Sequence, residues 1–196
     1  MSTIESGVEA ATAPREAKHK SLLREVVETI LLTVAIYVIV NAATGRFRIQ
    51  GASMEPTLHS GQFVITNKVA YKIGQPRRGD IIVFIAPRTA QEEDYIKRII
   101  GLPGETVRVE ARKVYVNGQM IEEPYIADAP QYSSTWKVGP DEYFVLGDNR
   151  NHSNDSHDWG LLKRDAILGK AWLIYWPPEF WGGVPNYSAY SLASTP

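Results

Sequence analysis

The chain has 196 residues, a formal net charge of -1 and no cysteine. This length suits one soluble domain of about 150 residues in addition to one membrane segment. The balanced charge provides no basic field, so we expect no nucleic-acid partner. The lack of cysteine excludes disulfides, thiolate zinc sites and cysteine nucleophiles.

Residues 1–24 are predicted to form a disordered cytoplasmic tail. Residues 1–20 are rich in Ala, Ser, Thr, Glu and Lys, and their only large apolar residues are Ile4 and Val8. Such a segment cannot bury enough apolar surface to become ordered.

Residues 25–43 are predicted to form a single transmembrane anchor. Glu28 is the only charged residue between positions 26 and 43, and 18 residues are close to the minimum for a spanning helix. Four lysines or arginines precede this run within residues 15–24, and two follow it, so the amino end is expected in the cytoplasm. The alternative is a cleavable secretory signal, although the apolar region of such signals is shorter and their leaders rarely exceed twenty residues. In both cases the rest of the chain leaves the cytoplasm.

Residues 44–178 are predicted to form one β domain, because short alternating apolar runs are separated by turn signals. The predicted strands cover residues 47–50, 62–68, 81–85, 94–100, 106–109, 113–116, 143–146 and 171–176. No helix of ordinary length is indicated besides the anchor, so we predict a mainly antiparallel β fold, either a barrel or a sandwich. Residues 179–196 show no periodicity and are predicted to form a loosely packed C-terminal tail.

Ser53 is a candidate nucleophile that lies soon after the apolar run. A serine hydroxyl needs a nearby base to accept its proton. The usual base is histidine, and the chain has four: His19, His59, His152 and His157. His19 precedes the apolar run and is expected on the other side of a membrane, and none of the other three has an obvious apolar strand that would fix its position. The alternative is that Ser53 merely begins the turn before Pro56.

Lys97 is the candidate base, since Ser-Lys pairs are a known variant of the serine hydrolase arrangement. It is the only lysine with aromatic or branched aliphatic residues on both sides and no turn signal within three positions. Strand alternation places Lys97 on one face with Tyr95 and Ile99, and Arg98 on the other face. To act as a base near neutral pH, Lys97 needs a pKa roughly three units below about 10.4, which requires burial. The alternative is a surface lysine on an edge strand.

Four segments of the chain resemble the type I signal peptidases, which are membrane-anchored Ser-Lys endopeptidases. They are residues 53–58 (Ser-Met-Glu-Pro-Thr-Leu), 78–84 (Arg-Gly-Asp-Ile-Ile-Val-Phe), 97–104 (Lys-Arg-Ile-Ile-Gly-Leu-Pro-Gly) and 147–156 (Gly-Asp-Asn-Arg-Asn-His-Ser-Asn-Asp-Ser). The resemblance implies that Ser53 and Lys97 are catalytic and that no cofactor or metal is needed. It also implies that signal peptides of exported preproteins are the substrates, cut on the outer side of a plasma or thylakoid membrane.

The resemblance also implies supporting roles for residues around the catalytic pair. Ser153 matches a serine that hydrogen-bonds the lysine amine, and Asp155 matches a carboxylate that holds this segment together. Gly51 occupies a position where many members have a serine that assists oxyanion binding, so the second donor besides the Ser53 N–H stays open. His157 stands where an arginine often follows, so its ion pair with Asp155 is expected to depend on pH.

The Asp-Asn-Arg-Asn-His-Ser-Asn-Asp run at residues 148–155 does not fit the calcium loop of an EF-hand. A self-cleaving repressor-type protease would need a DNA-binding module, and none fits in the first 45 residues. A membrane-tethered, non-catalytic β binding domain is the alternative function.

Asp80 and Arg98 are predicted to be structural. Five residues are candidates for contact with the bilayer interface: Met54, Trp136, Trp159, Trp176 and Trp181.

Overall fold

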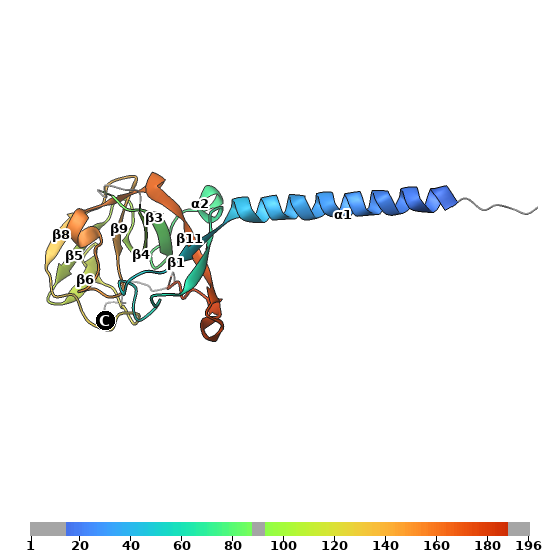
Figure 1. Ribbon diagram of the computed structural model, residues 1–196. Helices are drawn as coiled ribbons and strands as arrows, with labels where there is room; N and C mark the ends of the chain where they lie inside the picture. The colour runs from blue at the N-terminus through green and yellow to red at the C-terminus, as the bar shows by residue number, and fades with distance from the viewer. Residues whose placement is uncertain (1–14, 88–92, 188–196) are drawn as a thin grey trace, which may run out of the picture. The chain divides into compact units, whose positions relative to one another are not determined.

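The computed structural model describes residues 15–87 and 93–187, and the chain divides into two compact units, Met1–Asn41 and Ala42–Pro196 (Figure 1). The first unit holds most of one long helix, and the second is built mainly of antiparallel strands. The predicted fold class, mainly antiparallel β with one apolar N-terminal helix, is thereby confirmed.

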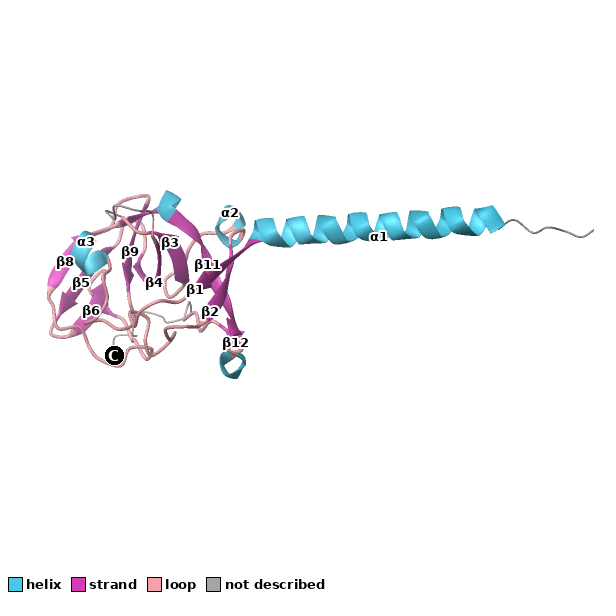
Figure 2. Ribbon diagram, viewed as in Figure 1, coloured by secondary structure: helices cyan, strands magenta, loops and turns pink. Residues whose placement is uncertain are grey.

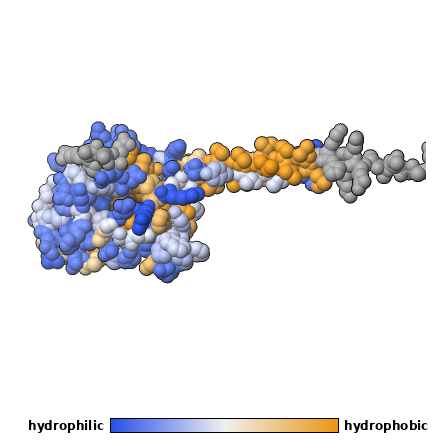
Figure 3. Space-filling view, in the orientation of Figure 1, coloured by the Kyte–Doolittle hydropathy of each residue, from blue (hydrophilic) through white to orange (hydrophobic). Residues whose placement is uncertain are grey.

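Helix α1 spans Arg15–Ala43, and residues Leu22–Ala43 are long and apolar enough to cross a membrane. Large apolar side chains are exposed along this part, and they form the orange helical surface in Figure 3. The hydroxyls of Thr29 and Thr33 each donate to a backbone carbonyl one turn earlier, at 2.8 Å. These polar groups are therefore satisfied within the helix, as an apolar environment requires.

The helix begins earlier than the anchor predicted from residue 25. Residues 15–24, assigned above to a disordered tail, are helical. Most of them are Arg, Glu, Ala, Lys or Leu, which are good helix formers, so a helix nucleated in the apolar segment extends back through them. Residues 1–14 of the predicted tail lie outside the described residues.

The larger of two antiparallel sheets in the second unit has the strand order β1-β2-β11-β3-β4-β9-β10, with β12 paired to β11 (Figure 2). Its strands are β1 (Thr44–Arg48), β2 (Phe63–Asn67), β3 (Ile81–Ile85), β4 (Asp94–Gly101), β9 (Glu142–Leu146), β10 (Leu162–Lys163), β11 (Ile167–Trp176) and β12 (Gly182–Gly183). Strand β3 is buried on both faces, because Ile81 packs in one buried cluster and Ile82 and Phe84 pack in another, which explains its uninterrupted apolar sequence.

The smaller sheet has the order β7-β6-β5-β8. Its strands are β5 (Thr106–Glu110), β6 (Lys113–Val116), β7 (Gln119–Met120) and β8 (Ser134–Lys137). Alternate valines of β5 and β6 are buried and pack with Phe144 and Leu146 of β9. This sheet therefore buries one face and exposes the other, the usual form of an antiparallel sheet.

Short helical segments connect some strands of the second unit. They are α2 (Ala70–Ile73), α3 (Ser156–Trp159), and the 3-10 turns η1 (Arg164–Ala166) and η2 (Pro178–Phe180). No helix of ordinary length occurs in the described part of this unit, in agreement with the sequence pattern.

Residues 182–187 are part of the packed β unit and differ from the loosely packed tail predicted from residue 179. Val184 is buried, and the Asn186 side chain accepts from the Ile81 N–H at 2.8 Å and donates to the Ala171 carbonyl at 3.2 Å. A single side-chain amide thus joins this segment to β3 and β11. The sequence shows no periodicity here because the segment is held by tertiary hydrogen bonds.

Candidate active site

Ser53 lies in the loop between β1 and β2, and buried neighbours hold this loop in place. Met54 and Leu58 are only 1% and 0% exposed, and they pack in a cluster with Ile49. The Leu58 N–H donates to the Met54 carbonyl at 2.9 Å, and the Ile49 N–H donates to the Gln62 carbonyl at 2.8 Å. Met54 is therefore a core residue, and its interpretation from the sequence as a candidate contact with the bilayer is wrong.

Lys97 lies in the middle of β4, opposite Ile82 of β3. Its side chain is 4% exposed, and its Nζ donates to Ser53 Oγ at 2.8 Å and to the Ile96 carbonyl at 3.0 Å. Nζ also lies 5.2 Å from the centre of the Tyr95 ring. The structure thus brings together the two residues that the sequence singled out, 44 positions apart in the chain.

Burial lowers the pKa of Lys97 to about 8. Removal of water disfavours the ammonium form, because a charge is poorly solvated in a low-dielectric interior. The carboxylates of Asp155 and Asp148 act in the opposite direction and offset part of this effect. A substantial fraction of neutral amine is consequently present slightly above neutral pH.

Asn149 holds the backbone of the Ser53 loop in place by two hydrogen bonds. Its backbone N–H donates to the Ser53 carbonyl at 3.0 Å, and its side-chain amide donates to the Ala52 carbonyl at 3.1 Å. Residue 149 follows β9, the strand that neighbours β4 in the sheet. The segment that holds the Ser53 loop therefore follows β9, and Lys97 lies on the neighbouring strand β4.

Gly147 allows the segment after β9 to approach the Ser53 backbone very closely. A Cβ at this position would lie 2.2 Å from Ser153 Oγ and 2.4 Å from the Ser53 carbonyl oxygen. Only glycine fits such a contact without displacement of backbone. Residues 147–149 belong to one of the four segments that carry the family resemblance. Their contacts with Ser53 depend on tertiary packing, so no pattern in the sequence predicts them.

Ser153 is buried beside Gly147, but it does not make the hydrogen bond to Lys97 that the resemblance implies. Its Oγ has no hydrogen-bond partner among the described residues. In this structure, Lys97 instead reaches Ser53 Oγ and the carbonyl of its own neighbour Ile96.

Asp155 is fully buried and ties three groups together. One carboxylate oxygen accepts from the Gly147 N–H at 2.9 Å, and the other lies 2.7 Å from His157 Nδ1. The same oxygen accepts from the His157 N–H and caps α3. The hydrogen bond with Asp155 raises the pKa of His157, whose ring also stacks on Tyr132 at 4.2 Å. The expected Asp155–His157 ion pair is therefore formed when the imidazole is protonated.

Gly51 has a φ of +80°, a conformation that glycine adopts readily and a serine would adopt only with strain. No hydroxyl is available at this position. The Ser53 N–H donates to no other group in the described part of the chain. This leaves one backbone donor free beside the Ser53 hydroxyl.

A cleft of about 700 Å³ opens at Ser53 and Lys97. Residues 46–50 and residues 93–97 make up most of its lining. The first group belongs mainly to β1, the edge strand of the larger sheet, and the second mainly to β4. Two extended strands therefore border the candidate catalytic pair.

The aromatic candidates for membrane contact fall into two classes. Trp136 and Trp159 pack against buried clusters and are partly covered, whereas Trp176 and Trp181 are 52% and 68% exposed.

No group of three metal-ligating side chains gathers within residues 15–87 and 93–187.

Comparisons with known proteins converge on one family. A family model for signal peptidase, peptidase S26, matches residues 23–176. The chain is 42% identical over 170 residues to a probable signal peptidase I-2 of Synechocystis sp., covering 84% of this chain and 77% of that protein. It is also 42% identical over 178 residues to a signal peptidase I of Leptolyngbya laminosa, covering 86% and 87%. A crystal structure of a signal peptidase I from Enterococcus faecalis is 35% identical with a TM-score of 0.46, covering 50% of this chain and 97% of that chain.

Proposed function

Since the chain belongs to the signal peptidase family, peptidase S26, we propose that it removes signal peptides from exported preproteins. Ser53 is the nucleophile in this proposal, and Lys97 is the general base. The main support is the 2.8 Å hydrogen bond from Lys97 Nζ to Ser53 Oγ at a site where Lys97 is almost completely buried.

Neutral Lys97 takes the proton of Ser53 as Oγ attacks the carbonyl carbon of the scissile peptide bond. The Lys97 ammonium then protonates the leaving amine, which departs as the new amino terminus of the mature protein. The signal peptide remains as an ester on Ser53. Lys97, again neutral, activates water to hydrolyse this ester and regenerate the serine.

The negative charge that develops on the carbonyl oxygen needs hydrogen-bond donors. The free backbone N–H of Ser53 is the donor we propose, with Gly51 allowing the turn that presents it. Asp155 supports the site by holding the Gly147 N–H. Ser153 is proposed as a further support, because its buried hydroxyl is unpaired in the described part of the chain and lies against Gly147 near Ser53.

An extended signal peptide fits between β1 and β4. Strand β1 is the last strand of the larger sheet in the described part of the chain, and a peptide can add to its outer edge by main-chain hydrogen bonds. Alternate side chains of the peptide would then point to the same side. The family resemblance implies small side chains at the first and third positions before the cut. A shallow surface beside Ser53 would accept such side chains and exclude bulky ones.

Residues Leu22–Ala43 would anchor the enzyme in the plasma or thylakoid membrane. The excess of lysine and arginine before this apolar segment supports a cytoplasmic amino end. The β unit then lies outside the cytoplasm, where signal peptides emerge.

The proposed activity is tested by incubating the purified full chain with an exported preprotein and sequencing the products by mass spectrometry. We expect one cut after a small residue, and loss of that cut when the residue before it is changed to leucine. Binding of the preprotein without cleavage would instead indicate a non-catalytic binding domain.

Gly147→Ala is expected to lower kcat/KM for preprotein cleavage by roughly a hundredfold. The new methyl group must displace Ser153 or the Ser53 backbone, and a shift of about 1 Å at a catalytic group has an effect of this size. Gly182→Ala is the control, because a Cβ there meets no atom within 4 Å and the φ of Gly182 is not positive. Activity of Gly147→Ala within threefold of the control would contradict the proposed spacing role.

A further inference from the structure

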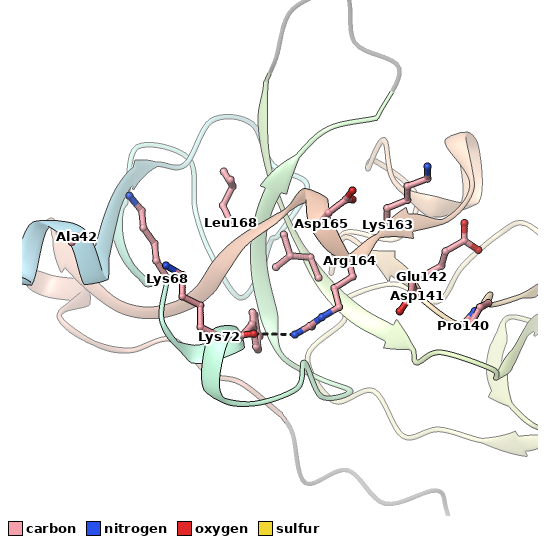
Figure 4. A pocket seen from close by; sticks show the side chains of 12 residues that line it. Ala42, Lys68, Lys72, Pro140, Asp141, Glu142, Lys163, Arg164, Asp165 and Leu168 are labelled. Atoms are coloured by element: carbon pink, nitrogen blue, oxygen red, sulfur yellow. Dashed lines mark hydrogen bonds between the residues drawn. The ribbon is translucent and has the colours of Figure 1, made fainter.

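A cavity of about 1030 Å³ lies outside the catalytic cleft and shares no lining residue with it (Figure 4). Tyr71, Ile167 and Leu168 contribute apolar surface, and the rest of the lining is mostly charged. The proposed peptidase mechanism uses none of these residues, so the cavity requires an explanation of its own.

The cavity lies where the chain enters the β unit. Lys68 lines it, and the Lys68 N–H donates to the carbonyl of Ala43, the last residue of the candidate span, at 2.9 Å. The Asn67 side chain accepts from two backbone N–H groups of the following turn, at 2.9 Å each, and so fixes the turn that carries Lys72. The Lys68 backbone therefore contacts the last residue of the candidate span, and Lys72 lies in the turn that follows Lys68.

Four cations line this cavity, and none forms an ion pair with any described residue: Lys68, Lys72, Lys163 and Arg164. Arg164 uses one nitrogen to donate to the Tyr71 carbonyl at 2.9 Å. Its other terminal nitrogen has no acceptor among the described residues. The two fully buried arginines, Arg98 and Arg150, are each paired with a carboxylate, whereas the half-buried Arg164 is not.

The carboxylates of the cavity are separated from the two lysines. Asp141 and Glu142 belong to the end formed by β9 and β10, where Glu142 is the register partner of Lys163. Figure 4 shows them at the opposite side of the cavity from Lys68, and Asp165 is also displaced toward that side. The end nearest Ala43 is therefore cationic.

We propose that this cavity binds the phosphate headgroup of an anionic phospholipid, with Lys68 and Lys72 facing the phosphate. The apolar side chains of Ile167 and Leu168 would contact the glycerol and the start of an acyl chain. Anionic lipids attract lysine and arginine within a short distance of the membrane surface. This inference rests on the membrane anchorage in the proposed function, and it adds a lipid site independent of the catalytic pair.

The test is native mass spectrometry of the detergent-solubilised full chain, titrated with dioctanoyl phosphatidylglycerol or dioctanoyl phosphatidylcholine. We expect the wild type to retain one phosphatidylglycerol and to bind phosphatidylcholine much more weakly. In Lys68→Gln/Lys72→Gln the apparent affinity for phosphatidylglycerol should fall about 25-fold, roughly fivefold for each lysine. Lys113→Gln/Lys137→Gln, which changes exposed lysines of the smaller sheet, should bind like the wild type.

Equal binding of both lipids, or unchanged binding by Lys68→Gln/Lys72→Gln, would overturn the proposal. Displacement of phosphatidylglycerol by equimolar inorganic phosphate would show a site for free anions and would equally overturn the lipid assignment. Preprotein cleavage is measured on the same detergent samples, and alkali-resistant membrane attachment is measured on membranes that contain the same variants before solubilisation. If both persist while phosphatidylglycerol does not bind, this inference alone fails; if cleavage or attachment is absent, the proposed function fails.

Discussion

Ser53→Ala and Lys97→Met are each expected to lower kcat/KM for preprotein cleavage by a factor on the order of 10⁴ to 10⁶. The alanine variant removes the atom that attacks the peptide bond. The methionine variant keeps a similar volume but cannot accept the serine proton. Because the two groups act as one unit, the double variant is expected to be no slower than the slower single variant.

Matched variants separate a catalytic effect from misfolding. Ser60→Ala changes an exposed serine of the same loop and should retain full activity. Lys97→Met should be more stable than the wild type, because the folded protein lowers the pKa of Lys97 from 10.5 to about 8. The free energy cost of the buried ammonium is fully present below pH 8, amounts to about 3 kcal/mol, and disappears as the pH rises toward 10.5. Retained cleavage in either Ser53→Ala or Lys97→Met would exclude the proposed pair.

Asp148→Asn is expected to lower the free energy of unfolding by about 3 to 5 kcal/mol. Arg98 and Asp148 are both fully buried and joined by two hydrogen bonds of 2.8 and 2.7 Å. The guanidinium also lies 4.1 Å from the centre of the Tyr125 ring and 5.0 Å from that of Tyr187. Removal of the carboxylate charge leaves a buried cation without compensation, which costs more than the pair itself contributes.

The measurement is urea unfolding of the full chain in detergent micelles, followed by tryptophan fluorescence. Glu110→Gln is the control, because its pair with Arg108 is exposed and such pairs contribute at most about 1 kcal/mol. If Asp148→Asn destabilised the protein no more than this control, the buried pair would not have the structural role assigned to Arg98. That role agrees with the interpretation of Arg98 from the sequence.

Strands with a clear local pattern could be predicted from the sequence. Residues 81–85, 94–100 and 113–116 correspond closely to β3, β4 and β6, since burial on both faces or alternation is encoded in consecutive residues. Strand β8, Ser134–Lys137, was missed because it is largely exposed and only Trp136 packs against the core. Strand β11 begins at Ile167, before the predicted 171, because Gly169 and Lys170 interrupt its apolar pattern.

The sequence allows prediction of those site residues whose side chains take part directly in the proposed reaction. Ser53 and Lys97 could be selected from residue type, strand context and family resemblance. The contacts of Asn149 and Gly147 with the Ser53 loop could not, because they arise where two distant loops meet. The bond expected between Ser153 and Lys97 is not formed, since residue matching gives no information on which rotamer a side chain adopts.

The dependence of kcat/KM on pH tests most directly whether Lys97 is a desolvated base. Cleavage requires the neutral amine, so the rate should rise with pH, tenfold per unit at low pH, and level off around an apparent pKa near 8. The substrate should have no ionisable groups near the cut, so that the pH dependence of kcat/KM reports titration of the enzyme and not of the substrate. A rising limb centred near 8 is the result we expect, and one centred near 10, the value of a solvated lysine, would contradict the proposed role of Lys97.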